Sequence, residues 1–303
     1  MKAALEYFLL YLLFVIAGSV VLAIPVAIIL LATQGMSVVD ELGNNMWFMS
    51  SIIIGGNLLT WLIFWKKKYT RYNFNVTTDK PSYNYKQLYL GAALACLGCL
   101  VLALLIQMIV PFPDAEEIDV LDDMMTNPLG LLGICILAPL AEESVFRGAI
   151  ERTLLEKGFK PWIAILVAAG YFVIAHFNLA QGSTALIIGA CMGWVYYRTR
   201  SVWPCIFMHA LNNTTASLIS LKVPEDTYNM ISQSPAWEIG MAVGGLLLLY
   251  VGVKLIANLP KAIAPAIEEE AVAPAVEAVV APAIEEETVA DLPVEESDNP
   301  TEA

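Results

Sequence analysis

The sequence predicts an all-α membrane protein: a polytopic helix bundle of about eight transmembrane segments followed by a disordered acidic C-terminal tail. Hydrophobic residues make up 58% of the 303 residues, and the mean hydropathy is +0.67. A helix needs about 20 mostly apolar residues to cross a bilayer. The chain repeatedly offers stretches of about that length, so we expect a multi-pass membrane protein.

The expected segments differ in length, and the fifth and sixth are short enough to be tilted or partly enclosed by protein. The first has no positively charged run before it beyond Lys2 and no small-residue cleavage site, so we expect it to be retained. The five cysteines fall inside apolar segments, where cysteine behaves as a small apolar residue. The expected ranges are 7–32, 47–65, 88–110, 129–155, 161–177, 184–197, 202–221 and 237–257.

The charges of the connections predict the orientation. Positive residues are enriched in cytoplasmic loops. The connection after the second segment carries Lys66, Lys67, Lys68, Arg71, Lys80 and Lys86. The stretch 110–129 carries no base and the acids Asp114, Glu116, Glu117, Asp119, Asp122 and Asp123. The connection after the second segment is therefore expected in the cytoplasm. Eight spans then place both termini in the cytoplasm. The protein is expected to be a multi-pass protein of the cell membrane.

The C-terminal tail, 261–303, accounts for most of the net charge. It carries −11 of the total of −13 and repeats the sequence of 264–270 at 281–287. Its prolines, small residues and glutamates cannot form a packed core, so we expect a disordered tail that is available to a cytoplasmic partner. The expected organisation is 1–128 for the N-terminal segments, 129–221 for a catalytic core, 222–260 for the last segment and 261–303 for the tail.

Three charged residues lie close together in the stretch 139–147 of the fourth apolar segment: Glu142, Glu143 and Arg147. A charge at the bilayer centre costs about 2.5 to 3.5 kcal/mol, so three within six residues require mutual compensation or a function. On a helix Glu143 and Arg147 are i and i+4 and can pair, while Glu142 points about 100° away. The pattern therefore predicts that Glu143 is a structural acid and that Glu142 is free to take part in a reaction. An alternative is that all three only lock neighbouring helices together.

The chain has only two histidines, and both fall in expected membrane segments. His176 lies in the fifth and His209 in the seventh, where Asn213 follows at i+4 on the same helix face. A lone intramembrane histidine is more often a helix-to-helix hydrogen-bond partner than a catalyst. Both histidines together with an acid pair favour a functional site. His176 falls near the outer end of its segment, so that helix must start deeper, tilt or extend beyond the expected range.

These residues form three ordered motifs: Glu142-Glu143-x-x-x-Arg147, Phe172-x-x-x-His176 and His209-x-x-x-Asn213. Their order on three apolar segments resembles the CPBP family of intramembrane proteases, which includes type II CAAX prenyl endopeptidases and bacteriocin-processing or immunity (Abi-like) proteins. The resemblance covers roughly 129–221 and is complete at the motif positions. It implies an intramembrane endopeptidase, a hydrolase that acts on a peptide or membrane-protein substrate.

In the implied reaction, Glu142 takes a proton from water as general base, assisted by His176, while His209 and Asn213 stabilise the oxyanion. Glu143 and Arg147 are then structural support. Zinc is the alternative, with Glu142, His176 and His209 as three ligands and water in the fourth position. There is no His-Glu-x-x-His motif, and the resemblance to the type II prenyl endopeptidases favours metal-independent catalysis.

Two other classes of function remain open at this point. The same bundle could be a non-proteolytic membrane scaffold or regulator, including one with a bacteriocin-immunity function. Intact motif residues argue against this reading, because a scaffold has no chemical need for all of them. A transporter is the second alternative, since intramembrane acids and histidines also form proton relays, but neither internal repeats nor paired broken helices are evident. No nucleic-acid signature is present.

Overall fold

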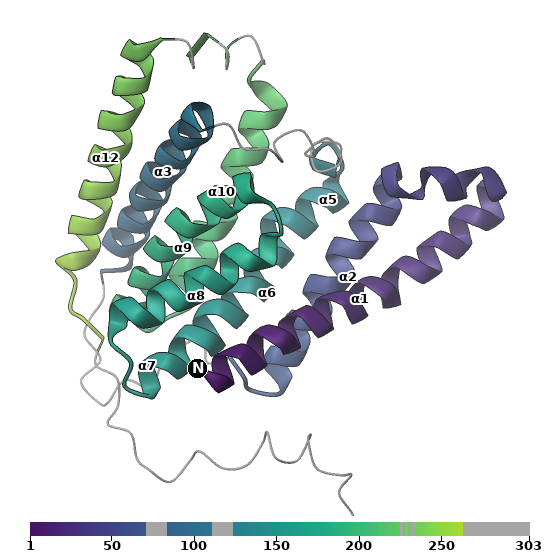
Figure 1. The fold of residues 1–303 in the computed structure, drawn as a ribbon, viewed down its shortest axis with the longest axis horizontal. Helices are drawn as coiled ribbons and strands as arrows, with labels where there is room; N and C mark the ends of the chain where they lie inside the picture. The colour runs from purple at the N-terminus through teal and green to yellow at the C-terminus, as the bar shows by residue number, and fades with distance from the viewer. Residues whose placement is uncertain (71–83, 111–123, 225–226, 228–229, 232–233, 263–303) are drawn as a thin grey trace, which may run out of the picture. The chain divides into compact units, whose positions relative to one another are not determined.

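The computed structural model describes residues 1–70, 84–110, 124–224, 227, 230–231 and 234–262, and the elements of this part of the chain are helices. Figure 1 shows their order. Residues 111–123 of the acidic connection and residues 263–303 of the expected disordered tail lie outside the described residues.

Eight helical segments correspond to the eight expected ones. The sixth, α9, begins five residues earlier than expected because the side-chain oxygen of Asn178 accepts a hydrogen bond from the backbone N–H of Gln181 and caps the helix. The helices are α1 (Lys2–Gln34), α2 (Met46–Lys66), α3 (Tyr85–Ile109), a composite segment over Pro128–Glu156, α8 (Pro161–His176), α9 (Leu179–Thr199), α10 (Trp203–Lys222) and α12 (Pro235–Ala257).

Six of these segments are long and apolar enough to cross a membrane, and the protein is a multi-pass membrane protein. The two others, α8 and α10, were also expected to span. With 16 residues, α8 is about 24 Å long, shorter than the hydrocarbon core of about 30 Å. α10 has 20 residues but carries His209, two asparagines and four hydroxyl side chains. These polar groups reduce its mean hydropathy.

The composite segment is a continuous helix with two π-helical stretches. Its parts are α5 (Pro128–Leu132), η3 (Gly133–Leu137), α6 (Ala138–Val145), η4 (Phe146–Glu151) and α7 (Arg152–Glu156). Pro139 has no backbone N–H to donate to the carbonyl four residues earlier, and its ring crowds that carbonyl. A widened turn just before it accommodates both effects. The π-helical stretches flank α6, which carries Glu142 and Glu143, and such stretches are frequent at functional sites.

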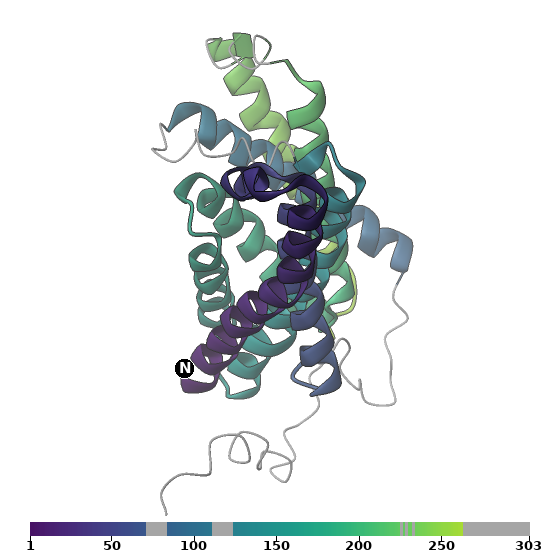
Figure 2. The same cartoon turned by 90° about the vertical axis from the view of Figure 1, so that its right-hand side faces the viewer.

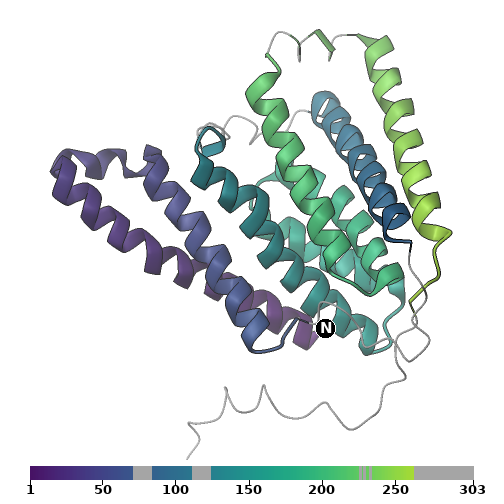
Figure 3. The ribbon, with the colours of Figure 1, turned by 180° about the vertical axis from the view of Figure 1, so that it is seen from behind.

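The remaining helices enclose this segment. Contacts join α1 to α2, α2 to α6, α6 to α10, α10 to α3 and α3 to α12, and Figure 3 shows these helices in that order across one side of the bundle. The helices α8 and α9 pack on each other and lie on the opposite side, facing the viewer in Figure 1. The turned view in Figure 2 separates the two sides.

Glycines allow the closest helix contacts. A Cβ at Gly98 of α3 would lie 2.5 Å from the backbone nitrogen of Leu249 in α12, and one at Gly252 of α12 would overlap the backbone of Ala95. Without a hydrophobic driving force between helices in lipid, such close backbone packing is a main source of association. These glycines therefore hold α12 against α3.

One end of the bundle gathers most of the described positive charges, and we call it the basic end. It is tied together by hydrogen bonds: the Arg152 guanidinium donates to the Tyr69 carbonyl at 2.9 Å, and that of Arg198 donates to the Ala257 carbonyl at 2.9 Å. Gln87 of α3 donates to the Leu255 carbonyl at 2.8 Å. The basic end comprises Lys2, Lys66, Lys67, Lys68, Lys86, Arg152, Lys157, Lys160, Arg198, Arg200, Lys254 and Lys261.

Candidate active site

The buried acid of the motif, Glu143, is fixed by two partners. Its Oε1 accepts a hydrogen bond from Arg147 Nη1 at 2.7 Å and lies 2.8 Å from His209 Nδ1. Both Glu143 and Arg147 have fully buried side chains. Arg147 also donates to the Gly189 carbonyl at 2.8 Å and lies over the Phe172 ring at 5.0 Å. The expected pairing of Glu143 with Arg147 is confirmed, and the contact of Glu143 with His209 is a further feature.

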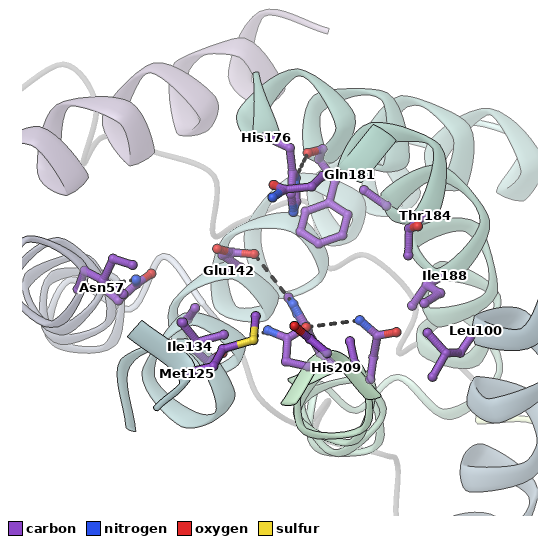
Figure 4. A pocket seen from close by; sticks show the side chains of 18 of the residues that line it. Asn57, Leu100, Met125, Ile134, Glu142, His176, Gln181, Thr184, Ile188 and His209 are labelled. Atoms are coloured by element: carbon purple, nitrogen blue, oxygen red, sulfur yellow. Dashed lines mark hydrogen bonds and ion pairs between the residues drawn. The ribbon is translucent and has the colours of Figure 1, made fainter. Parts of the chain in front are cut away.

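The neighbouring acid, Glu142, faces a cavity instead. Its side chain is 16% exposed, and its Oε2 lies 3.8 Å from His209 Nε2. Figure 4 shows Glu142 and His209 turned toward one another across this distance. The same turn of α6 therefore directs Glu142 to the cavity and Glu143 to the protein interior, as the rotation of about 100° per residue predicts.

His209 lies between the two carboxylates. A carboxylate oxygen can only accept a hydrogen bond, so the contact with Glu143 places a hydrogen on Nδ1 of His209 and turns Nε2 toward Glu142 and the cavity. When Nε2 carries a hydrogen as well, the imidazolium donates to both sides. Glu143 thus orients the His209 ring. The sequence predicted only a structural role for Glu143, as the partner of Arg147.

The other histidine, His176, ends α8. Its Nδ1 lies 2.7 Å from the Phe172 carbonyl, which can only accept, so Nδ1 carries the hydrogen and Nε2 of the neutral ring is an acceptor. The next residue, Phe177, closes the helix in a left-handed conformation with φ of 50°. The sequence placed His176 near the outer end of its segment. In the structure α8 is short and ends at His176, and this last residue lines the cavity.

Asn213 lies on the same face of α10 as His209. Its Nδ2 donates to the Ile134 carbonyl at 2.8 Å, and its Oδ1 accepts from Asn212 at 3.1 Å. Ile134 belongs to η3, where the widened turn changes the backbone pairing, so the asparagine also stabilises the composite segment. One further N–H of the Asn213 amide is available to a bound group.

All four expected catalytic residues line one cavity of 960 Å³, a volume within the range of small-molecule and peptide sites. Figure 4 shows how Glu142, His176 and His209 surround part of this space, with Gln181 and Thr184 along another part. Sequence reasoning did not place Asn57, Gln107, Gln181, Thr184 or Asn212 at the site, although all of them line it. The side-chain amide of Gln107 donates to the Thr184 hydroxyl at 2.9 Å.

The zinc alternative requires three ligands that converge on one point. Within the part of the chain that the structure describes, no group of three His, Cys, Asp or Glu side chains is arranged to hold a metal ion. Glu142, His176 and His209 share the cavity but do not form such a group. The described arrangement therefore does not fit a preformed three-ligand site, and we derive no step through a metal.

Comparisons with known proteins match the segment of the chain that carries these residues. Residues 125–215 match the family model described as type II CAAX prenyl endopeptidase Rce1-like. The chain is 30% identical over 129 residues to the Bacillus subtilis (strain 168) protein named "Putative membrane peptidase YdiL". That match covers 43% of this chain and 51% of the relative, so the chain spans about half the length of the curated relative it matches. No solved structure matches the chain significantly.

The matched residues 125–215 contain Glu142, His176, His209 and Asn213 together with Glu143 and Arg147. The resemblance predicted from the three motifs is therefore confirmed: over this segment the chain is similar to the type II CAAX prenyl endopeptidases of the CPBP family.

Proposed function

We propose that this protein is an intramembrane endopeptidase that hydrolyses peptide bonds with a water molecule activated by Glu142. One observation carries the proposal: two adjacent glutamates have opposite environments. Glu143 is held by Arg147 and His209, whereas Glu142 faces a cavity large enough for a peptide segment. A scaffold would have no use for an intramembrane carboxylate kept available in this way.

In the proposed reaction, Glu142 removes one proton from water, while Nε2 of the neutral His176 accepts a hydrogen bond from the remaining O–H and orients the molecule. The water oxygen attacks the peptide carbonyl carbon, and the carbonyl oxygen becomes an oxyanion. His209, protonated at Nε2, and the free amide hydrogen of Asn213 donate to it. The C–N bond then breaks, the leaving nitrogen takes the proton from Glu142, and a carboxylic acid and an amine are released.

The conservative variant Glu142→Gln tests the base. It keeps the size of the side chain and removes the basic oxygen, so we expect cleavage of an accepted peptide by the purified protein to fall by about 10²- to 10⁴-fold. The melting temperature in detergent should stay the same because Glu142 lies at the cavity surface. Full activity of this variant would exclude Glu142 as the base.

Chelation tests the metal alternative. We expect peptide cleavage to survive exhaustive chelation, since His209 and Asn213 can stabilise the oxyanion without a Lewis acid. The matched measurement is the metal content of the purified protein before and after treatment. If activity is lost and one equivalent of a single metal restores it, Glu142, His176 and His209 must rearrange into a ligand set.

A further inference from the structure

The wall of the cavity includes a tyrosine that the proposed reaction has not used. Tyr11 belongs to α1, outside the matched segment 125–215, and it lines the same cavity as Glu142 and His176. α1 reaches the site because it packs against α6 and η4. The Tyr11 side chain is 7% exposed, so the surrounding protein holds it. A tyrosine from a helix outside the family motifs is therefore part of the active-site wall.

Aromatic contacts fix the position of the Tyr11 ring. The ring meets Phe146 edge-on with the centroids 5.3 Å apart, and Phe146 meets Phe172 in the same way at 5.0 Å. Phe172 in turn lies edge-on to the His176 ring at 4.7 Å. Edge-to-face pairs of this kind are favoured by the charge distribution of the rings. A continuous row of rings therefore connects Tyr11 to one of the expected catalytic histidines and holds the phenol in place.

The contact with Phe146 also brings Tyr11 close to Glu142. The Phe146 N–H donates to the Glu142 carbonyl, so Phe146 lies one helical turn after Glu142 and on the same face. Tyr11 packs on Phe146 and shares the cavity with Glu142, and the charge of Glu142 acts on the Tyr11 hydroxyl. Hydrogen bonds used in catalysis are often long in a protein without substrate and tighten in the complex.

The proposed reaction contains a proton transfer that suits such a hydroxyl. Glu142 holds the proton that it removed from water, and the leaving nitrogen must receive this proton before the C–N bond breaks. A hydroxyl can accept one hydrogen bond while it donates another, and tyrosine is among the side chains that act as general acids and bases. A phenol beside Glu142 can therefore pass the proton on without becoming charged itself.

From this arrangement we propose that Tyr11 is a further catalytic residue, which relays the proton from Glu142 to the leaving nitrogen. The phenol gives its hydrogen to the nitrogen of the tetrahedral intermediate and takes the hydrogen of the Glu142 carboxylic acid. The C–N bond breaks with its electron pair on nitrogen, and the oxyanion closes to the carbonyl. Glu142 ends as a carboxylate and Tyr11 as a phenol. This role rests on the proposed peptidase function.

Two substrates and two phenylalanine variants test the relay. One substrate is a peptide that the purified protein cleaves and Glu142→Gln does not, and the other is the matching ester, with oxygen in place of the scissile N–H. Tyr11→Phe removes the hydroxyl and keeps the ring that packs on Phe146. Tyr7→Phe is the matched control, since Tyr7 lies one turn earlier on α1, packs on Tyr69 at 5.6 Å and is not a lining residue of the described cavity.

We expect Tyr11→Phe to lower kcat for the peptide by about 10²-fold, the lower end for a positioned proton-transfer group, with KM and melting temperature unchanged. The ester should lose much less, because an alkoxide leaves without the prior protonation that an amide nitrogen needs. Tyr7→Phe should behave like the wild-type protein with both substrates. Asn213→Ala should slow the peptide and the ester alike, since both form an oxyanion.

Equal kcat values for Tyr11→Phe and the wild-type protein would overturn the relay. Equal losses on peptide and ester would also overturn it, because the hydroxyl would then act on the oxyanion or in binding. A Tyr11→Phe protein that no longer folds would make the hydroxyl structural. If the wild-type protein cleaves no peptide, or if Glu142→Gln is fully active, the proposed function itself fails, whereas cleavage that needs Glu142 and not the Tyr11 hydroxyl removes the relay alone.

Discussion

Whether a charged side chain of this site is buried or faces the cavity depends on its position around one turn of the helix. Glu143 and Arg147 point into the protein, where each compensates the other at 2.7 Å. Because Glu143 also contacts His209 at 2.8 Å, the same acid pairs with Arg147 and orients the His209 ring. Glu142, one position earlier, faces the cavity.

Removal of one member of the buried pair should therefore be costly. Arg147→Ala leaves Glu143 buried with only His209 as a charged or polar partner, and we expect a loss of about 3 to 5 kcal/mol, as is usual when one partner of a buried ion pair is removed. Glu143→Gln should reduce both folded yield and activity. Thermal unfolding in detergent measures the first effect and peptide cleavage the second.

The double variant Glu143→Gln with Arg147→Ala is the control, because it removes both charges at once. Its loss of stability should be smaller than the sum of the two single losses. Single variants that are inactive yet as stable as the wild-type protein would instead assign Glu143 and Arg147 direct catalytic roles.

At the scale of the helices, the α3 and α12 contact depends on the absence of side chains. A Cβ at Gly252 would overlap the backbone of Ala95, whereas a Cβ at Gly244, in the same helix, would meet nothing within 4 Å. We expect Gly252→Ala to destabilise the protein by about 1 to 3 kcal/mol through forced separation of the helices. Gly244→Ala should be neutral or slightly stabilising.

Unfolding temperatures of the two α12 variants in the same detergent provide the comparison. Equal temperatures would show that α12 does not pack on α3 as described.

The helices and the pairing of Glu143 with Arg147 could be predicted from the sequence, because both depend on local spacing and apolar runs. The contact of Glu143 with His209 could not, since it joins residues 66 positions apart and no local pattern encodes it. The π-helical stretches around α6 were also missed. Pro139 was the available signal, but a proline in an apolar run predicts a kink or break as readily as a widened turn.

At the scale of the whole chain, we expect the site to work without the tail. Lys261 and Ala262 still contact the end of α9, where the Ala262 N–H donates to the Arg198 carbonyl at 3.0 Å. The tail that follows is acidic, and the anionic lipids of a membrane surface would repel it. Truncation after Ala262 should therefore change peptide cleavage by the purified protein less than about twofold, the scale of a small surface effect.

The control for the truncation is the melting temperature of the shortened protein. A large loss of cleavage in a truncated protein that melts like the full chain would show that the tail belongs to the catalytic unit.

The measurement that tests the central claim most directly compares the membrane peptidomes of cells that produce equal amounts of wild-type protein and of Glu142→Gln. The proposed activity predicts peptides with new termini, derived from membrane proteins, that appear only with the wild-type protein. Identical peptidomes from two correctly inserted, equally abundant proteins would contradict proteolysis by Glu142 and favour a non-proteolytic role for the bundle.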